Sequence, residues 1–226
     1  MQSEVNPVSF DHTPFPNPTP PVQDLSKTLV SVSTRFNPEE QDIQNANVVL
    51  VAEDQVYFYV HLEALLSRSS NNFGSLLNNS IKNAKTEVDI SQPMNTPDLL
   101  VSPTFITTEY TADVLNVVLH CVYGFSVESY RPLPATLRAA TTALFDLGYP
   151  LPDIFIAHSE PYMLFLQAAV AEPLAMYAVA AQYSLESLAV AVSTFTLAVS
   201  PSDISDELAQ QMGPIYLRRL FCMVPR

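Results

Sequence analysis

The side chains that could carry chemistry are few and widely spaced. They are the histidines His12, His61, His120 and His158 and the cysteines Cys121 and Cys222. Their spacings match no metal-ligand pattern with Cys, Asp or Glu. Adjacent residues on a helix point to different faces, so we expect His120 and Cys121 to be a helix-face His beside a core Cys rather than a nucleophile pair. We expect both cysteines to be buried free thiols.

The charged pairs and the glycines also indicate structural roles. Glu39-Glu40 fits a loop, Asp203 and Asp206-Glu207 fit cap and helix-start positions, and Arg218-Arg219 fits the polar side of a final helix. The chain has only four glycines, too few and too scattered for a glycine-rich phosphate loop. The sequence therefore predicts no catalytic residue, no bound metal and no cofactor, and an enzyme is not expected.

The composition narrows the class of partner. The net charge is −13 and the pI is about 4.5, so nucleic acid and anionic membranes would repel the chain on average. Basic or apolar protein surfaces are the expected partners. No apolar run approaches the ~20 residues of a membrane span, and the first residues lack the basic and apolar regions of a secretory signal. We expect an intracellular protein of the cytoplasm or nucleus.

The first 40 residues differ in composition from the rest. They are rich in Pro, Ser, Thr and Asn, and they have no sustained apolar period. This predicts a disordered, Pro-rich arm over residues 1–40 that serves as a linker or as a docking peptide for a partner. Within it, Thr28–Val32 has the composition of a short strand.

The next segment predicts a hairpin followed by short helices. Val48–Val51 and Val56–Val60 are apolar, β-rich runs separated by four residues. His61 precedes a helical pattern of leucines, and Ser69–Asn72 is typical of a cap before a second short helix. That second helix would carry Phe73, Leu76 and Leu77. A third strand is expected at either Glu87–Ile90 or Phe105–Thr108, and the latter is favoured because it leads directly into the next helix.

The remaining pattern is helical. Thr111 and Ser184 are expected N-caps, and Gly124 is an expected helix end. The predicted helices cover residues 111–123, 134–147, 163–171, 173–183, 185–197 and 204–223, the last with a break near Gly213-Pro214. We expect the final helix to pack on the 163–197 helices through Ile215, Leu217, Leu220, Phe221 and Met223.

This order of elements resembles a BTB (POZ) domain. The phrases that carry the resemblance are Tyr59-Val60-His61 at the end of the second strand, Cys121-Val122-Tyr123-Gly124 at the turn, and Leu133–Tyr149 as the following helix pair. The chain is most similar to uncharacterised BTB proteins of mushroom-type fungi, over residues 45–223. The resemblance implies an α+β fold, with a BTB/POZ-like domain over residues 41–150 and a helical extension over residues 151–226 packed on it.

Two departures bear on partners. BTB relatives carry an acidic residue at the position of Asn47 and a basic residue at Leu62, and we expect the neutral pair here to lie together and to be mostly buried. Cullin-3 adaptors often carry a hydrophobic-x-Glu motif after the turn. Here Ser126-Val127-Glu128 has Ser at the hydrophobic position, and Leu133-Pro134-Ala135 lacks the Glu.

The resemblance therefore implies a non-enzymatic protein-interaction module that could form a homodimer. One alternative is a substrate adaptor of a cullin-3 ubiquitin ligase, although its motif is not intact. A weaker alternative is a transcriptional regulator that uses the BTB-like part to self-associate, but no zinc-finger spacing or basic stretch is present. The sequence does not identify the partner.

Overall fold

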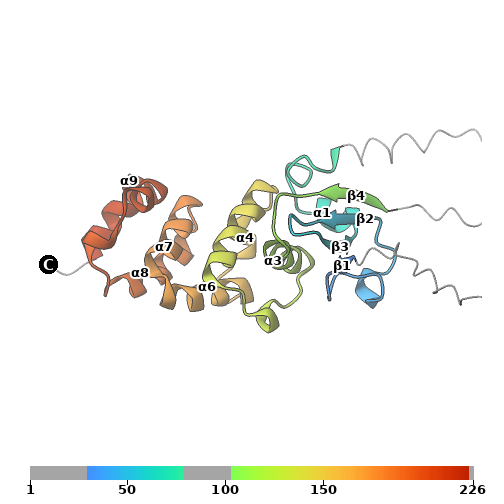
Figure 1. The fold of residues 1–226 in the computed structure, drawn as a ribbon. Helices are drawn as coiled ribbons and strands as arrows, with labels where there is room; N and C mark the ends of the chain where they lie inside the picture. Colours follow the sequence, from blue (N-terminus) through green and yellow to red (C-terminus); the bar gives the residue numbers. More distant parts are fainter. Residues whose placement is uncertain (1–29, 79–102, 224–226) are drawn as a thin grey trace, which may run out of the picture.

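The computed structural model of the chain describes residues 30–78 and 103–223, and its elements run from a sheet at one end to a row of helices leading away from it (Figure 1). The expected α+β class is confirmed. The strands are β1 (Ser31–Val32), β2 (Val48–Val51), β3 (Val56–Val60) and β4 (Thr104–Thr107). The helices are α1 (Leu62–Leu66), α3 (Ala112–Tyr123), α4 (Pro134–Asp146), α5 (Leu151–Ile154), α6 (Glu160–Ala171), α7 (Pro173–Gln182), α8 (Glu186–Thr196) and α9 (Asp206–Met223).

The four strands form one mixed sheet in the order β1-β3-β2-β4. β2 and β3 form the predicted antiparallel hairpin, whose turn places Gln55 at φ 61°. β4 pairs in parallel with β2, and β1 pairs in parallel with β3. All four residues of β2 are buried, which fits a continuous apolar run in a central strand covered on both faces.

The choice of Phe105–Thr108 as the third strand is confirmed by β4. The competing Glu87–Ile90 lies outside the described residues. Ser31–Val32 of the proposed Thr28–Val32 strand does pair with β3, while Thr28 and Leu29 also lie outside the described residues.

The second short helix is not formed over Phe73 to Leu77, where it was predicted. Residues 70–77 form a turn, and Asn72, Phe73, Gly74 and Ser75 all have φ between 56° and 66°. The cause is local: Ser69 Oγ accepts from the Phe73 amide and Asn71 Oδ1 accepts from the Gly74 amide, each at 2.7 Å. Such side chain-to-backbone bonds compete with helical ones. Phe73 and Leu77 are nevertheless fully buried.

The predicted later helices are confirmed, but the helix pair expected over Leu133–Tyr149 is the single helix α4, and two caps differ. Thr111 occupies the N-cap position of α3 without a side-chain bond. The cap is instead Asp54, whose Oδ1 in the hairpin turn accepts from the Ala112 amide at 2.9 Å. The N-cap of α8 is Leu185, one residue after the expected Ser184. Gly124 ends α3 in a left-handed conformation at φ 70°, as its type predicts.

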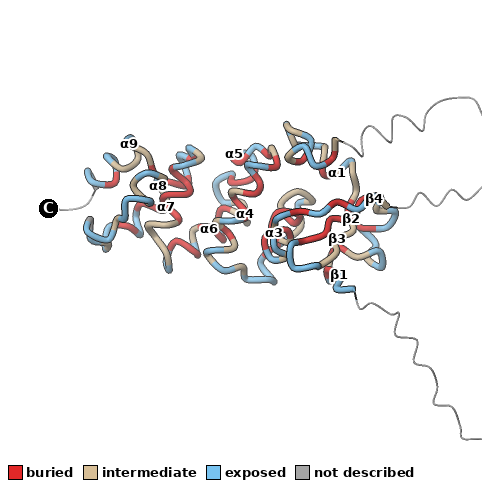
Figure 2. Tube along the Cα trace, turned by 45° about the horizontal axis from the view of Figure 1, so that its top comes forward, coloured by how far each residue is buried: buried red, intermediate tan, exposed pale blue. Residues whose placement is uncertain are grey.

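One continuous hydrophobic core joins the sheet to the helical stack, from Phe36 to Leu220, with exposed residues on the outside (Figure 2). The final helix packs mainly on α7, as expected, through fully buried Leu220 and half-buried Leu217. Ile215 and Phe221 do not join the core: 66% and 48% of their surface is exposed. The side chain of Met223 lies outside the described residues.

The prediction that the disordered arm extends to residue 40 is also wrong, because residues 30–40 are part of the fold. Phe36 within that range is fully buried, and Ser33 is buried too. Residues 1–29 lie outside the described residues.

Candidate functional site

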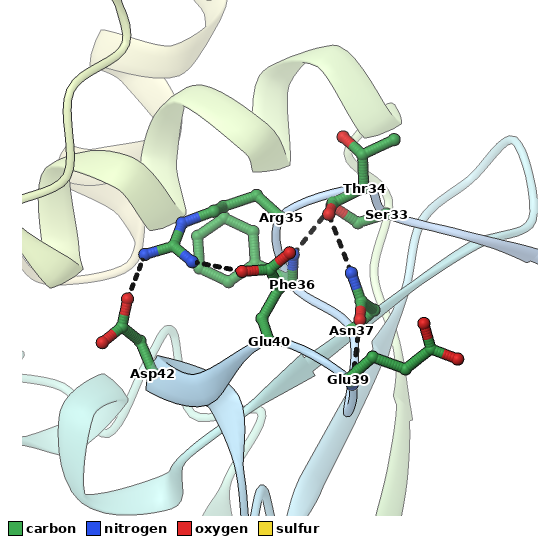
Figure 3. Close-up of polar contacts among 8 residues, drawn as sticks. All are labelled: Ser33, Thr34, Arg35, Phe36, Asn37, Glu39, Glu40 and Asp42. Atoms are coloured by element: carbon green, nitrogen blue, oxygen red, sulfur yellow. Dashed lines mark hydrogen bonds and ion pairs between the residues drawn. The ribbon is translucent and has the colours of Figure 1, made fainter.

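The segment that sequence reasoning assigned to the arm is held in a compact loop against the sheet and α3 (Figure 3). The Phe36 amide donates to Ser33 Oγ at 3.2 Å, Asn37 Nδ2 donates to the Thr34 carbonyl at 2.7 Å, and the Glu39 amide donates to Asn37 Oδ1 at 2.9 Å. These short-range bonds fix the backbone on either side of Phe36. We call residues 33–43 the anchor segment.

Arg35 and Phe36 attach the anchor segment to the domain. The Phe36 ring centroid lies 5.1 Å from that of His120 and 5.4 Å from that of Tyr123. The Arg35 guanidinium lies 4.1 Å above the Phe125 ring and pairs with Glu40 at 3.1 Å and Asp42 at 2.5 Å. A basic-aromatic pair with acidic residues five and seven positions later was the available sequence signal.

His61 connects three segments that are far apart in the sequence. Its Nε2 lies 2.9 Å from the Gln44 carbonyl, which can only accept, so Nε2 carries the proton. Nδ1 is then the acceptor for the Tyr123 hydroxyl at 3.1 Å, and the His61 amide donates to the same hydroxyl at 2.8 Å. Nδ1 thus holds the end of β3 to the end of α3, and Nε2 holds it to the loop before β2, so both ring nitrogens have structural tasks.

Asn47 and Leu62 lie together, as expected, but they are not mostly buried. Asn47 Oδ1 accepts from the Leu62 amide at 2.8 Å, at the start of α1. Asn47 is exposed and Leu62 is half-buried. Asn47 therefore acts as a capping acceptor for the first amide of α1 rather than as one half of a buried pair.

This geometry changes the expected effect of substitutions at the pair. Asn47→Ala should lower the free energy of unfolding by about 1 kcal/mol, because it removes a capping acceptor, while Asn47→Asp should retain stability. Leu62→Lys should cost about 1 kcal/mol or less, because a half-buried Lys can reach water. Urea unfolding of the three variants measures this. A cost several times larger for Leu62→Lys would restore the buried-pair hypothesis.

His120 and Cys121 are on different faces of α3, but their surroundings differ from those expected. His120 is the core residue, only 1% exposed, with Tyr130 at 4.9 Å and Phe36 at 5.1 Å between ring centroids. Cys121 is half-buried, and burial raises the pKa of its thiol to about 12. Cys222 is exposed, so the prediction that it is buried is wrong, although both cysteines are free.

His120 should make the fold sensitive to acid. Burial lowers its pKa below the ordinary 6.5, and nearby Arg35 adds to this, while the bond from Nδ1 to the Asn116 carbonyl and the charge of Glu160 act in the opposite direction. The unfolded chain therefore binds a proton more readily than the folded one as pH falls below about 6.5. Stability should decrease there, by up to about 1.4 kcal/mol per pH unit from this group.

The measurement is the urea midpoint of wild type and His120→Asn between pH 7.5 and pH 5, at about constant ionic strength. Asn can keep a donor toward the Asn116 carbonyl but cannot titrate. The variant should be less stable at neutral pH and should show a shallower loss on acidification. Parallel pH curves for the two proteins would show that His120 does not contribute.

The charged pairs have the structural roles expected of them. Glu40 pairs with Arg35, and Asp206 and Glu207 occupy the first turn of α9. Arg219 contacts both carboxylate oxygens of Glu186, at 2.7 and 2.8 Å, from an exposed side of α9. Over residues 30–78 and 103–223, no three His, Cys, Asp or Glu side chains are grouped as a metal site would require. Within the same ranges, no helix has the length and apolar character needed to cross a membrane.

Residues 126–128, which align with the expected adaptor motif, are hydrogen-bonded to Glu160 of α6. Glu160 Oε1 accepts from Ser126 Oγ at 3.0 Å, from the Val127 amide at 2.5 Å and from the Glu128 amide at 2.8 Å. Val127 is buried. Sequence reasoning did not find Glu160, because the contact joins residues more than thirty positions apart.

The comparisons with known proteins found no similar protein. No family model matches the chain, and neither the curated proteins nor the solved structures include a match.

Proposed function

We propose that the chain is a non-enzymatic protein-interaction module of the BTB type, with a helical extension packed on it, and that it self-associates or binds a partner through its sheet. The single observation that carries the proposal is the apolar character of the sheet edges. β1 and β4 are the outer strands, and Val30, Val32 and Phe105 beside or within them are 48%, 38% and 60% exposed. An outer strand with exposed apolar side chains is a template for pairing with another chain.

The arrangement of His61 and Tyr123 supports the BTB assignment. The two phrases that resemble the family come from positions 62 residues apart, and their side chains meet in one hydrogen-bonded corner. The hairpin, the helix after it and the parallel third strand also follow the expected order.

The test introduces a charge at one edge. Phe105→Lys should abolish self-association in sedimentation velocity, or remove the proteins that co-purify with the tagged full chain from its native cell. Phe145→Lys is the matched control, because Phe145 is a similarly exposed Phe (56%) on α4. A chain that is monomeric and recovers the same proteins with either substitution would refute the sheet as the interaction surface.

The alternative of a cullin-3 adaptor gains no support from the contacts of residues 126–128. Their amides and the Ser126 hydroxyl are bound to Glu160, and Val127 is in the core. If cullin-3 co-purified with the chain and still did so after Ser126→Ala and Val127→Ala, the adaptor alternative would be supported through another surface.

A further inference from the structure

A groove of about 360 Å³ lies where α7, α8 and the second half of α9 meet. It exists because α9 is interrupted at Gly213, whose φ of 70° and ψ of 167° fall in a region essentially restricted to glycine. Pro214 then starts a new helical segment at its preferred first position. This change of direction places Tyr216, Arg218, Arg219 and Cys222 along one side of the groove, opposite α8.

The polar groups in the groove are mostly paired with one another. Glu186 accepts from the Tyr216 hydroxyl at 3.0 Å and from Arg219, and these two hydrogen bonds lower the pKa of the Glu186 carboxyl. The Tyr177 hydroxyl donates to the Tyr216 carbonyl at 3.1 Å. The Arg219 guanidinium lies 5.2 Å from the Tyr216 ring centroid. These contacts hold the two tyrosines and the Glu186–Arg219 ion pair in place. The charges of Glu186 and Arg219 neutralise each other.

Arg218 also lines the groove, but its guanidinium takes no part in these hydrogen bonds and ion pairs. It is exposed and makes no ion pair with any carboxylate of residues 30–78 or 103–223. Beside it the wall is apolar, with Ala189 and Val190 from α8, and 59% of the Val190 surface is exposed. In a chain of net charge −13 this is a locally basic and apolar position.

We propose that this groove binds a short segment of a partner protein that carries a carboxylate next to an apolar side chain. The carboxylate meets Arg218, since a guanidinium binds carboxylates in bidentate geometry, and the apolar side chain lies against Val190. A nucleic acid or another polyanion does not fit, because one unpaired guanidinium cannot offset repulsion by the acidic chain. The inference rests on the proposed function as a protein-interaction module and adds a surface and a partner chemistry. That chemistry differs, at this one groove, from the basic or apolar partners that the net charge of the whole chain predicts.

The test is selection of short random peptides on the immobilised full chain, followed by affinity measurements on the enriched peptides. We expect the enriched sequences to share Asp or Glu beside Leu, Ile, Val or Phe. Their affinity should fall about tenfold with Arg218→Glu and with Val190→Glu, and it should weaken with added salt. Arg218→Lys should cause a smaller loss than Arg218→Glu, because it keeps the charge but not the bidentate geometry. Arg131→Glu is the matched control, because Arg131 is also exposed and has no ion pair within the described ranges. Circular dichroism and thermal melting establish that each variant is folded.

Three results would overturn the proposal: no enriched peptide, enriched peptides that lack a carboxylate, or equal binding to Arg218→Glu and wild type. Self-association that is lost with Arg218→Glu would make the groove an interface between copies of this chain and would replace the proposed occupant. An interaction lost with Phe105→Lys but indifferent to Arg218→Glu would end the groove proposal and leave the proposed function standing.

Discussion

Replacing Phe36 by Ala should lower the free energy of unfolding by about 3–5 kcal/mol, the usual cost of removing a buried Phe. Phe36 is fully buried and contacts Phe58 from β3, His120 and Tyr123 from α3, and Phe125. The bonds from the Phe36 amide to Ser33 Oγ and from Asn37 Nδ2 to the Thr34 carbonyl fix the backbone of the anchor segment, so it cannot easily move into the resulting cavity. Equilibrium urea unfolding, followed by circular dichroism, measures the loss.

The matched control for this prediction is Phe145→Ala. It removes the same side chain from a site that is 56% exposed, so it should cost about 1 kcal/mol or less. Equal unfolding midpoints for Phe36→Ala and wild type would mean that the anchor segment detaches in solution. Removing residues 1–40 should destabilise the chain at least as much as Phe36→Ala, because it also removes β1. A chain that lacks only residues 1–29 is the control for that deletion.

The helices and the hairpin were predictable because local rules determine them. In α3 the apolar residues recur at helical spacing and Gly124 supplies the left-handed end, so its range was correct to within one residue. The apolar residues that recur at helical spacing in α4 and at its C-cap are all buried: Leu137, Ala140, Ala143, Leu144 and Leu147. Such patterns need no knowledge of what packs against them.

The anchor segment could not be found in the same way. Its burial depends on one aromatic residue, Phe36, and on Ile43 within a mostly polar stretch, so no periodicity marks it. The composition of the preceding residues then extended the predicted arm over residues 30–40, which belong to the fold. The same cause explains the error at His120, whose face of α3 is covered by Phe36.

The candidate surfaces were even less accessible from the sequence. Arg218-Arg219 reads as a polar pair, and nothing local distinguishes the residue that pairs with Glu186 from the one that does not. The distinction depends on how the segment after Gly213 lies across α8, which is a tertiary property. Glu160 is a similar case, because its three donors come from a loop far away in the chain.

Deleting residues 214–226 should cause the chain to aggregate or to lose cooperative unfolding. The segment contributes fully buried Leu220 and half-buried Tyr216 and Leu217, which pack against α7 and α8. Burying a Leu fully contributes roughly 1.5–3 kcal/mol, and half-buried side chains contribute less, so the three together supply a few kcal/mol of a typical total stability of about 5–15 kcal/mol. The deletion would also remove the Tyr216 carbonyl that accepts from the hydroxyl of buried Tyr177 in α7, and the Arg219 partner of Glu186 in α8. Size-exclusion chromatography and thermal melting of the 1–213 fragment measure this, with a chain that lacks only residues 224–226 as control.

Because Ile215 and Phe221 on the same segment are already exposed, some of its apolar surface is free for a partner. A soluble 1–213 fragment with a cooperative transition would therefore show that the segment is an appendage, and that its main role is binding rather than closing the core.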